Sequence, residues 1–168
     1  MLTNPNLLLG RLVNDSTVGT LFRLGISTPL IEALNNEDVI QMINKNVFIS
    51  TMYSPASMAQ INTSLPAGSR IIELDANTIE ELFPNTQERV AIILHEIGHA
   101  ITDLDLKQKL DPMGKEFAAD DFAIARGYLE PTLSGLITGF NINPTKFDTH
   151  SNRTRMVRLN QIKNGQTR

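Results

Sequence analysis

The sequence predicts an α+β fold that is mainly helical and includes a small β-sheet. Two observations carry this prediction. Apolar residues recur at helical spacing over most of the chain, whereas two short segments, residues 47–53 and 70–75, are rich in strand-forming residues. The chain has 168 residues, of which 41% are hydrophobic and 20% charged. This length and composition are typical of a single globular domain, which we expect to span residues 1–168.

The first third of the chain is predicted to be mostly helical. Thr28-Pro29 resembles a helix start, and residues 37–44 continue a helical apolar pattern. We interpret residues 1–60 as a support region for the elements that follow, with a removable inhibitory segment as the alternative. After the strand at 47–53, residues 54–69 are polar and contain two prolines, a pattern typical of a long loop.

Residues 95–99 read His-Glu-Ile-Gly-His. Residues four apart lie on nearly the same face of a helix, so His95 and His99 could bind one metal ion from adjacent turns. Glu96, beside the first histidine, could take a proton from a water molecule in an open position on that ion. Neutral imidazole suits zinc, so the motif predicts a zinc hydrolase with one Zn²⁺ ion.

The residues around the motif favour a helix. Residues 85–88 read Asn-Thr-Gln-Glu, which resembles a capping box, and apolar residues follow at helical spacing up to Ile101. Gly98 is unusual here, because glycine inside a helix costs about 1 kcal/mol relative to alanine. We expect Gly98 to allow another segment to approach closely beside the metal.

A second helix follows and supplies carboxylates for the site. Asp111-Pro112 is typical of a helix start, and Gly127 of a helix end. Between them, Glu116 and Asp120 lie on one face. A catalytic zinc site needs a third protein ligand, and either carboxylate has the right chemistry.

Together, the His-Glu-Ile-Gly-His helix and the downstream Glu-Phe-Ala-Ala-Asp segment resemble the gluzincin clan of zinc metallopeptidases. The likeness is greatest to the catalytic core of HtpX-like and CAAX-prenyl-type endopeptidases and to the small soluble minigluzincins. It implies a zincin-like fold with residues 68–127 as the metal-site core. It also implies that Glu116 is the third zinc ligand and that Asp120 orients one of the ligating imidazoles. Ligating histidines usually donate their other ring N–H to such a carboxylate.

Other third ligands fit the sequence less well. The long metzincin signature would require glycine and histidine where this chain has Thr102 and Asp105. Peptide deformylases use a cysteine ligand, and the chain contains no cysteine.

The resemblance also implies where a substrate binds. In gluzincins the strand just upstream of the motif helix is an exposed sheet edge along which an extended peptide lies. We therefore expect Ile71, Ile72, Glu73 and Leu74 to form that edge, because unpaired backbone groups can align a peptide whatever its side chains. An ordinary core strand is the alternative.

Residues 147–163 resemble the C-terminal element of the same family, in which a Thr-His-Pro segment leads into a helix that bears an arginine. Ser151 stands where proline is usual, and the spacing to the arginine is one residue shorter. The resemblance implies that His150, with or without Arg155, stabilises the oxyanion of the reaction. A capping role for His150 and a surface position for Arg155 are the alternatives.

Composition excludes several other classes of function. A formal net charge of -3 gives no basic footprint for nucleic acid, and no segment approaches the ~20 apolar residues of a membrane span. No signal peptide is recognisable, so we expect a soluble, intracellular protein, unlike the membrane-embedded relatives. The predicted function is a zinc metalloendopeptidase that acts on peptides or proteins. The alternatives are a non-catalytic zinc-site module and a peptidase dedicated to one regulatory protein.

Overall fold

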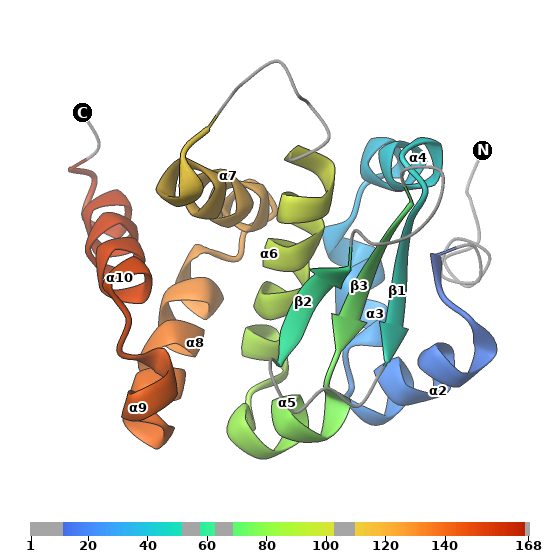
Figure 1. Ribbon diagram of the computed structural model, residues 1–168, viewed down its shortest axis with the longest axis horizontal. Helices are drawn as coiled ribbons and strands as arrows, with labels where there is room; N and C mark the ends of the chain where they lie inside the picture. Colours follow the sequence, from blue (N-terminus) through green and yellow to red (C-terminus); the bar gives the residue numbers. More distant parts are fainter. Residues whose placement is uncertain (1–11, 52–57, 63–68, 103–109, 167–168) are drawn as a thin grey trace.

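The computed structural model describes residues 12–51, 58–62, 69–102 and 110–166 (Figure 1). Helices dominate, and three short strands form one sheet, in agreement with the predicted α+β class. The elements are, in chain order, α2 (Asp15–Arg23), α3 (Ser27–Ala33), α4 (Asn36–Asn44), β1 (Val47–Thr51), β2 (Ala59–Asn62), β3 (Arg70–Leu74), α5 (Ala76–Leu82), α6 (Thr86–Thr102), α7 (Pro112–Ile124), α8 (Leu129–Ile142), α9 (Pro144–Phe147) and α10 (His150–Lys163).

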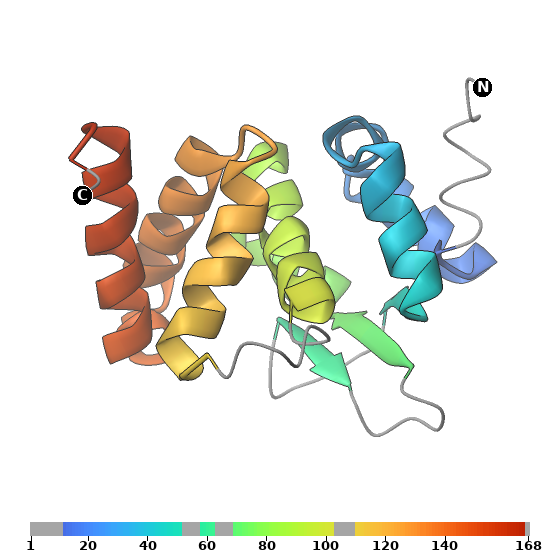
Figure 2. The same cartoon turned by 90° about the horizontal axis from the view of Figure 1, so that it is seen from above.

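Helix α6, which carries the His-Glu-x-x-His motif, runs through the middle of the molecule. Helices α7, α8 and α10 lie on one side of it, and the sheet with α2, α3 and α4 lies on the other (Figures 1 and 2). None of the helices in the described part of the chain combines the length and the apolar composition that crossing a membrane requires.

The sheet has the strand order β1-β3-β2. Strand β1 pairs with β3 in parallel, from Val47 opposite Arg70 to Thr51 opposite Leu74. Strand β2 pairs with β3 on its other side, antiparallel. The prediction that residues 71–74 form a sheet edge is therefore wrong, because both sides of β3 are paired.

The edge beside α6 belongs to β2, which packs against that helix. This strand lies inside the segment predicted to be a continuous loop, residues 54–69. Its four residues, Ala-Gln-Ile-Asn, alternate apolar and polar, but so short a run between two prolines is too weak a signal to predict a strand. Residues 52–57 and 63–68 of the same segment lie outside the described residues.

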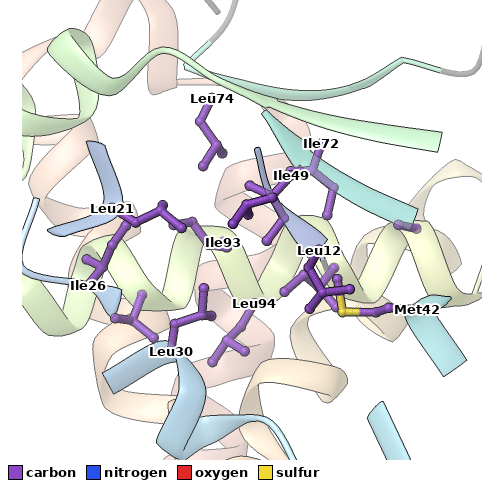
Figure 3. Close-up of a cluster of buried hydrophobic side chains, with 14 of the residues drawn as sticks. Leu12, Leu21, Ile26, Leu30, Met42, Ile49, Ile72, Leu74, Ile93 and Leu94 are labelled. Carbon is purple, nitrogen blue, oxygen red and sulfur yellow. The ribbon is translucent and has the colours of Figure 1, made fainter. Parts of the chain in front are cut away.

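The hydrophobic core lies between α6, the sheet and the N-terminal helices (Figure 3). Ile93 and Leu94 of α6 are fully buried there, as are Ile72 of β3 and Leu30 of α3. Complete burial of one such side chain contributes about 1.5–3 kcal/mol. The apolar pattern of residues 90–101 thus fixes which face of α6 meets the core, and it leaves the motif residues for the opposite side.

The N-terminal helices have the caps that their sequences favour. Helix α4 begins with a complete capping box, in which Asn35 and Asp38 exchange hydrogen bonds between side chain and backbone. Asp38 is buried and also pairs through both oxygens with Arg126, which follows α7. This ion pair joins the N-terminal support region to the end of the second metal-site helix.

Helix α7 starts and ends where the sequence predicts. Asp111 caps its first turn by accepting a hydrogen bond from the backbone N–H of Gly114, and Gly127, with φ +84°, follows its last turn. The helix lies directly on α6 at Gly98, where an added Cβ would be 2.8 Å from Cα of Ala119 and 2.9 Å from Cβ of Phe122. The predicted close approach beside Gly98 is confirmed, and α7 is the segment that makes it.

We predict that Gly98→Ala lowers the free energy of unfolding by about 1–3 kcal/mol, because the methyl group would push α7 away from α6. Gly19→Ala in α2 is the matched control, since an added Cβ there meets nothing within 4 Å. The control should raise the free energy of unfolding by about 0.5–1 kcal/mol, because alanine lowers the conformational entropy of the unfolded chain. Urea denaturation measures both. Equal stabilisation by the two substitutions would contradict the close contact of α6 with α7.

Candidate metal centre

Three side chains from α6 and α7 converge in the way that the motif predicts. Nε2 of His95 lies 3.3 Å from Oε2 of Glu116, and Nε2 of His99 lies 3.3 Å from Oε1 of the same carboxylate. The two imidazole rings are nearly perpendicular, with centroids 4.5 Å apart. One ligand atom from each of the three residues can be chosen so that all lie within 4.8 Å of one another. Such a group could hold a metal ion.

The donor set fits zinc in chemistry. Two imidazole nitrogens and one carboxylate form a frequent ligand set of catalytic zinc sites. Ligands about 2.0–2.1 Å from a tetrahedral ion are about 3.3–3.4 Å from each other. Each histidine lies at that distance from one oxygen of Glu116, although the two oxygens differ and the set of three ligand atoms spans up to 4.8 Å.

Asp120 contacts His95 at Nδ1, the ring nitrogen that does not face Glu116. Its Oδ1 lies 2.9 Å from Nδ1 of His95, and its side chain is fully buried. Because a carboxylate can only accept, the contact with Asp120 requires Nδ1 to donate, which leaves Nε2 for the metal side. Nη2 of Arg155 also lies 3.1 Å from this Nδ1, but its shorter contact, 2.6 Å, is the bond that it donates to Oδ1 of Asp120. The structure therefore brings Asp120 to the position in which the sequence predicts an orienting carboxylate.

Arg155 reaches the same carboxylate from α10. Its Nε donates to Oδ2 of Asp120 over 3.0 Å, and its Nη2 donates to Oδ1 over 2.6 Å. Its Nη1 lies 3.4 Å from Oε2 of Glu116. Arg155 as a whole residue is 8% exposed, so its charge does not lie at the surface. Its hydrogen bonds hold Asp120, and through Asp120 the imidazole of His95.

These contacts shift the pKa values of His95, Asp120 and Glu116. Burial and the charge of Arg155 lower the pKa of His95, but hydrogen bonds to Asp120 and Glu116 outweigh them, and the pKa rises above its usual value. Burial raises the pKa of Asp120, whereas its hydrogen bonds with His95 and Arg155 reverse that effect and lower it. Burial likewise raises the pKa of Glu116, and hydrogen bonds with the two histidines bring it well below its usual range. The pocket thus favours positive charge between its carboxylates.

Glu96 is half-buried and lines the same cavity as the three candidate ligands. No described side chain or backbone group forms a hydrogen bond or an ion pair with its carboxylate. A carboxylate that is next to a metal site and free of protein partners is available to exchange a proton with a bound water or substrate.

The cavity has a volume of about 370 Å³, within the usual range for a ligand site. Met58 and Ala59, at the start of edge strand β2, form part of its wall, but residues 71–74 of the predicted substrate edge do not. The structure therefore places β2, not β3, beside the candidate site.

His150 is not brought to the site. It is the exposed first residue of α10, directly after the N-cap Thr149, and it does not line the cavity. The prediction that it lies near the metal is wrong, because the helix begins at this residue and its side chain stays at the surface. Asn152, two residues further on, lines the cavity instead.

Sequence reasoning also missed Glu88. The predicted capping box would turn its side chain back to the start of α6, where Asn85 does accept a hydrogen bond from the backbone of Gln87. Glu88 instead accepts from the hydroxyls of Ser134 and Thr138 on α8 and lines the cavity. The signal was its position seven residues before His95, which places both on one helix face.

Comparisons of the chain with known protein families, with curated proteins and with solved structures find no match.

We predict that the purified protein binds one Zn²⁺ ion per chain and that His95→Ala and Glu116→Ala each abolish stoichiometric binding. Each substitution leaves two protein ligands, too few for a stable site. Elemental analysis after dialysis measures the metal content, and circular dichroism reports whether each variant is folded. A folded His95→Ala variant with a full zinc complement would contradict the ligand assignment.

We further predict that Asp120→Asn weakens zinc affinity by about 10–100-fold, because the amide cannot fix the imidazole of His95 as a carboxylate does. Asp121→Asn is the matched control, since Asp121 is exposed and pairs only with Arg158 among the described residues. Its zinc affinity should be unchanged. Competition titration with a chromophoric chelator measures both variants. Equal affinities in two folded variants would show that Asp120 does not position the ligand.

Proposed function

We propose that this protein is a zinc-dependent metallopeptidase with a gluzincin-like catalytic centre. The observation that carries the proposal is that ligand atoms of His95, His99 and Glu116 lie within 4.8 Å of one another in one cavity. The same cavity holds the carboxylate of Glu96, which has no hydrogen bond or ion pair with the described residues. The zincin-like fold is part of the same proposal. It is supported by a sheet edge, strand β2, that lies beside the motif helix.

His95, His99 and Glu116 would hold the ion. When bound, zinc supplies a Lewis acid that makes water acidic near neutral pH and polarises a peptide carbonyl.

Glu96 is the proposed general base and acid. Its carboxylate takes a proton from the attacking water and later delivers that proton to the leaving amine. The absence of protein hydrogen bonds to Glu96 among the described residues supports this role, because a carboxylate held in an ion pair would be a weaker base.

Asp120 and Arg155 act through the ligands. Asp120 keeps Nε2 of His95 directed to the metal side, and Arg155 balances the buried charge of Asp120. We therefore propose a positioning role for Arg155 in place of the oxyanion role that the family resemblance implies.

An extended peptide is proposed to bind along β2. The strand pairs with β3 on one side, and its start, at Met58 and Ala59, forms part of the cavity wall. Backbone groups on the other side of an edge strand can pair with a peptide of any sequence. Such pairing would lay the scissile bond across the cavity.

We predict that Glu96→Gln reduces kcat by about 10²–10⁴-fold while zinc binding is retained, because glutamine cannot accept the proton of the attacking water. Glu81→Gln, an exposed position in α5, is the matched control and should keep full activity. The measurement is cleavage of unfolded proteins by the zinc-loaded chain, followed by gel electrophoresis and identification of new termini. Equal cleavage by wild type and Glu96→Gln, or none by either on diverse substrates, would favour a non-catalytic zinc-site module.

A further inference from the structure

The cavity extends beyond the candidate metal ligands along α6. Glu88 lies seven residues before His95 on the same face of the helix, which places it about 10 Å from that ligand along the helix axis. The cavity wall also includes apolar side chains, of which Ala91 and Ile92 lie between Glu88 and His95 on α6; the others are Phe83, Leu136 and Phe147. The candidate metal ligands, apolar wall groups and the carboxylate of Glu88 therefore share one space.

Glu88 is 4% exposed and only partly satisfied. Its Oε1 accepts hydrogen bonds from Ser134 and, over 3.2 Å, from Thr138. Among the described residues, none donates to Oε2 and no cation forms an ion pair with the carboxylate. Oε2 is not among the buried side-chain oxygens that lack a partner, so it is open to the cavity, where a donor or a cation can reach it.

Gly135 keeps this part of the cavity open. It lies on α8 opposite Glu88, and an added Cβ would be 3.8 Å from Cβ of Glu88. Backbone conformation does not require glycine there, since no positive φ is found at this helical position. A larger side chain at position 135 would occupy the space in front of Glu88.

We propose that Glu88 determines substrate specificity, and that the cavity accepts the basic side chain of an arginine or lysine beside the scissile bond. The inference rests on the proposed peptidase function. The aliphatic stem of such a residue packs on the apolar walls, and its cationic head donates to Oε2 of Glu88. Long basic side chains combine an apolar stem with a charged end in this way, and ionised pairs form the strongest hydrogen bonds.

Lys146 is the one described cation, besides Arg155, that lines the same cavity. Arg155 is bound to Asp120, and Lys146 is exposed on α9 without an ion pair to Glu88. Neither of these two side chains neutralises Glu88, so within the described part of the chain its carboxylate is available to a substrate.

Two measurements test the proposal. First, the zinc-loaded full chain is incubated with a peptide library, and cleavage sites are read from the new termini. Arginine and lysine should be enriched at one position beside the scissile bond. Second, binding of acetyl-Ala-Ala-Arg-Ala-Ala-amide to the chelator-treated full chain is compared with its citrulline counterpart, which has the same shape without the charge. The arginine peptide should bind about tenfold tighter or better.

Substitutions test whether Glu88 causes the preference for the arginine peptide. Glu88→Gln keeps an acceptor for Ser134 and Thr138 but removes the charge, so the arginine-to-citrulline ratio should fall to near one. Glu130→Gln, which removes a carboxylate from the exposed face of α8, is the matched control and should leave the ratio unchanged. If Glu88→Gln does not fold, Gly135→Leu serves as the second variant and should weaken binding of the arginine peptide by filling the cavity.

The outcomes separate this inference from the proposed function. Cleavage without basic preference, or equal binding of the arginine and citrulline peptides by the wild type, overturns the role of Glu88 and leaves the peptidase proposal intact. A charge-dependent ratio that requires Glu88, without any cleavage, supports the basic-side-chain site and overturns the peptidase proposal.

Discussion

The contact of α6 with α7 at Gly98 is the constraint on which the site depends. The two histidines are set on α6 by helical periodicity alone, but the third candidate ligand comes from another helix. Glu116 reaches both imidazoles only because the α7 backbone lies against a residue without a side chain. Glycine in the middle of a helix costs about 1 kcal/mol relative to alanine. At position 98 it is needed because a Cβ there would clash with the backbone of α7.

The buried charge of Asp120 joins a third helix to the same arrangement. Helix α10 is largely polar, and its buried residues are Arg155 and Leu159. Arg155 reaches Asp120 through two hydrogen bonds, and Asp120 in turn holds His95. Removing one partner of a buried ion pair costs about 3–5 kcal/mol because the other charge is left alone. The docking of α10 and the orientation of the first ligand are therefore parts of one network.

The sequence predicted what depends on local periodicity. The two histidines lie four residues apart on one helix, and Glu116 and Asp120 are four apart on the next, so each pair shares a face whatever the rest of the chain does. Strand β2 was missed because four residues carry too little pattern. Strand β3 was taken for the edge because the family resemblance implies an edge strand just before the motif helix. His150 was misplaced because a motif learned from relatives with proline next to the histidine does not fix where α10 starts in a chain with Ser151.

Glu88 was missed for a different reason. Its sequence context matched a local role, the capping box, and only the packing of α8 on α6 shows that the side chain turns to Ser134 and Thr138 instead. Tertiary contacts decide which of the two roles the side chain takes, and the local sequence pattern around Glu88 does not contain them.

Charge balance links the metal end of the cavity to the rest of the site. Glu116 and Asp120 carry two negative charges, and Arg155 offsets one of them through its bonds to Asp120. One net negative charge would be left to face a divalent ion, in addition to the carboxylate of Glu96, which has no partner among the described residues. Arg155 is not confined to Asp120, because its Nη1 lies 3.4 Å from Oε2 of Glu116. Its single positive charge therefore stabilises both carboxylates, and two hydrogen bonds to Asp120 fix the direction of the guanidinium.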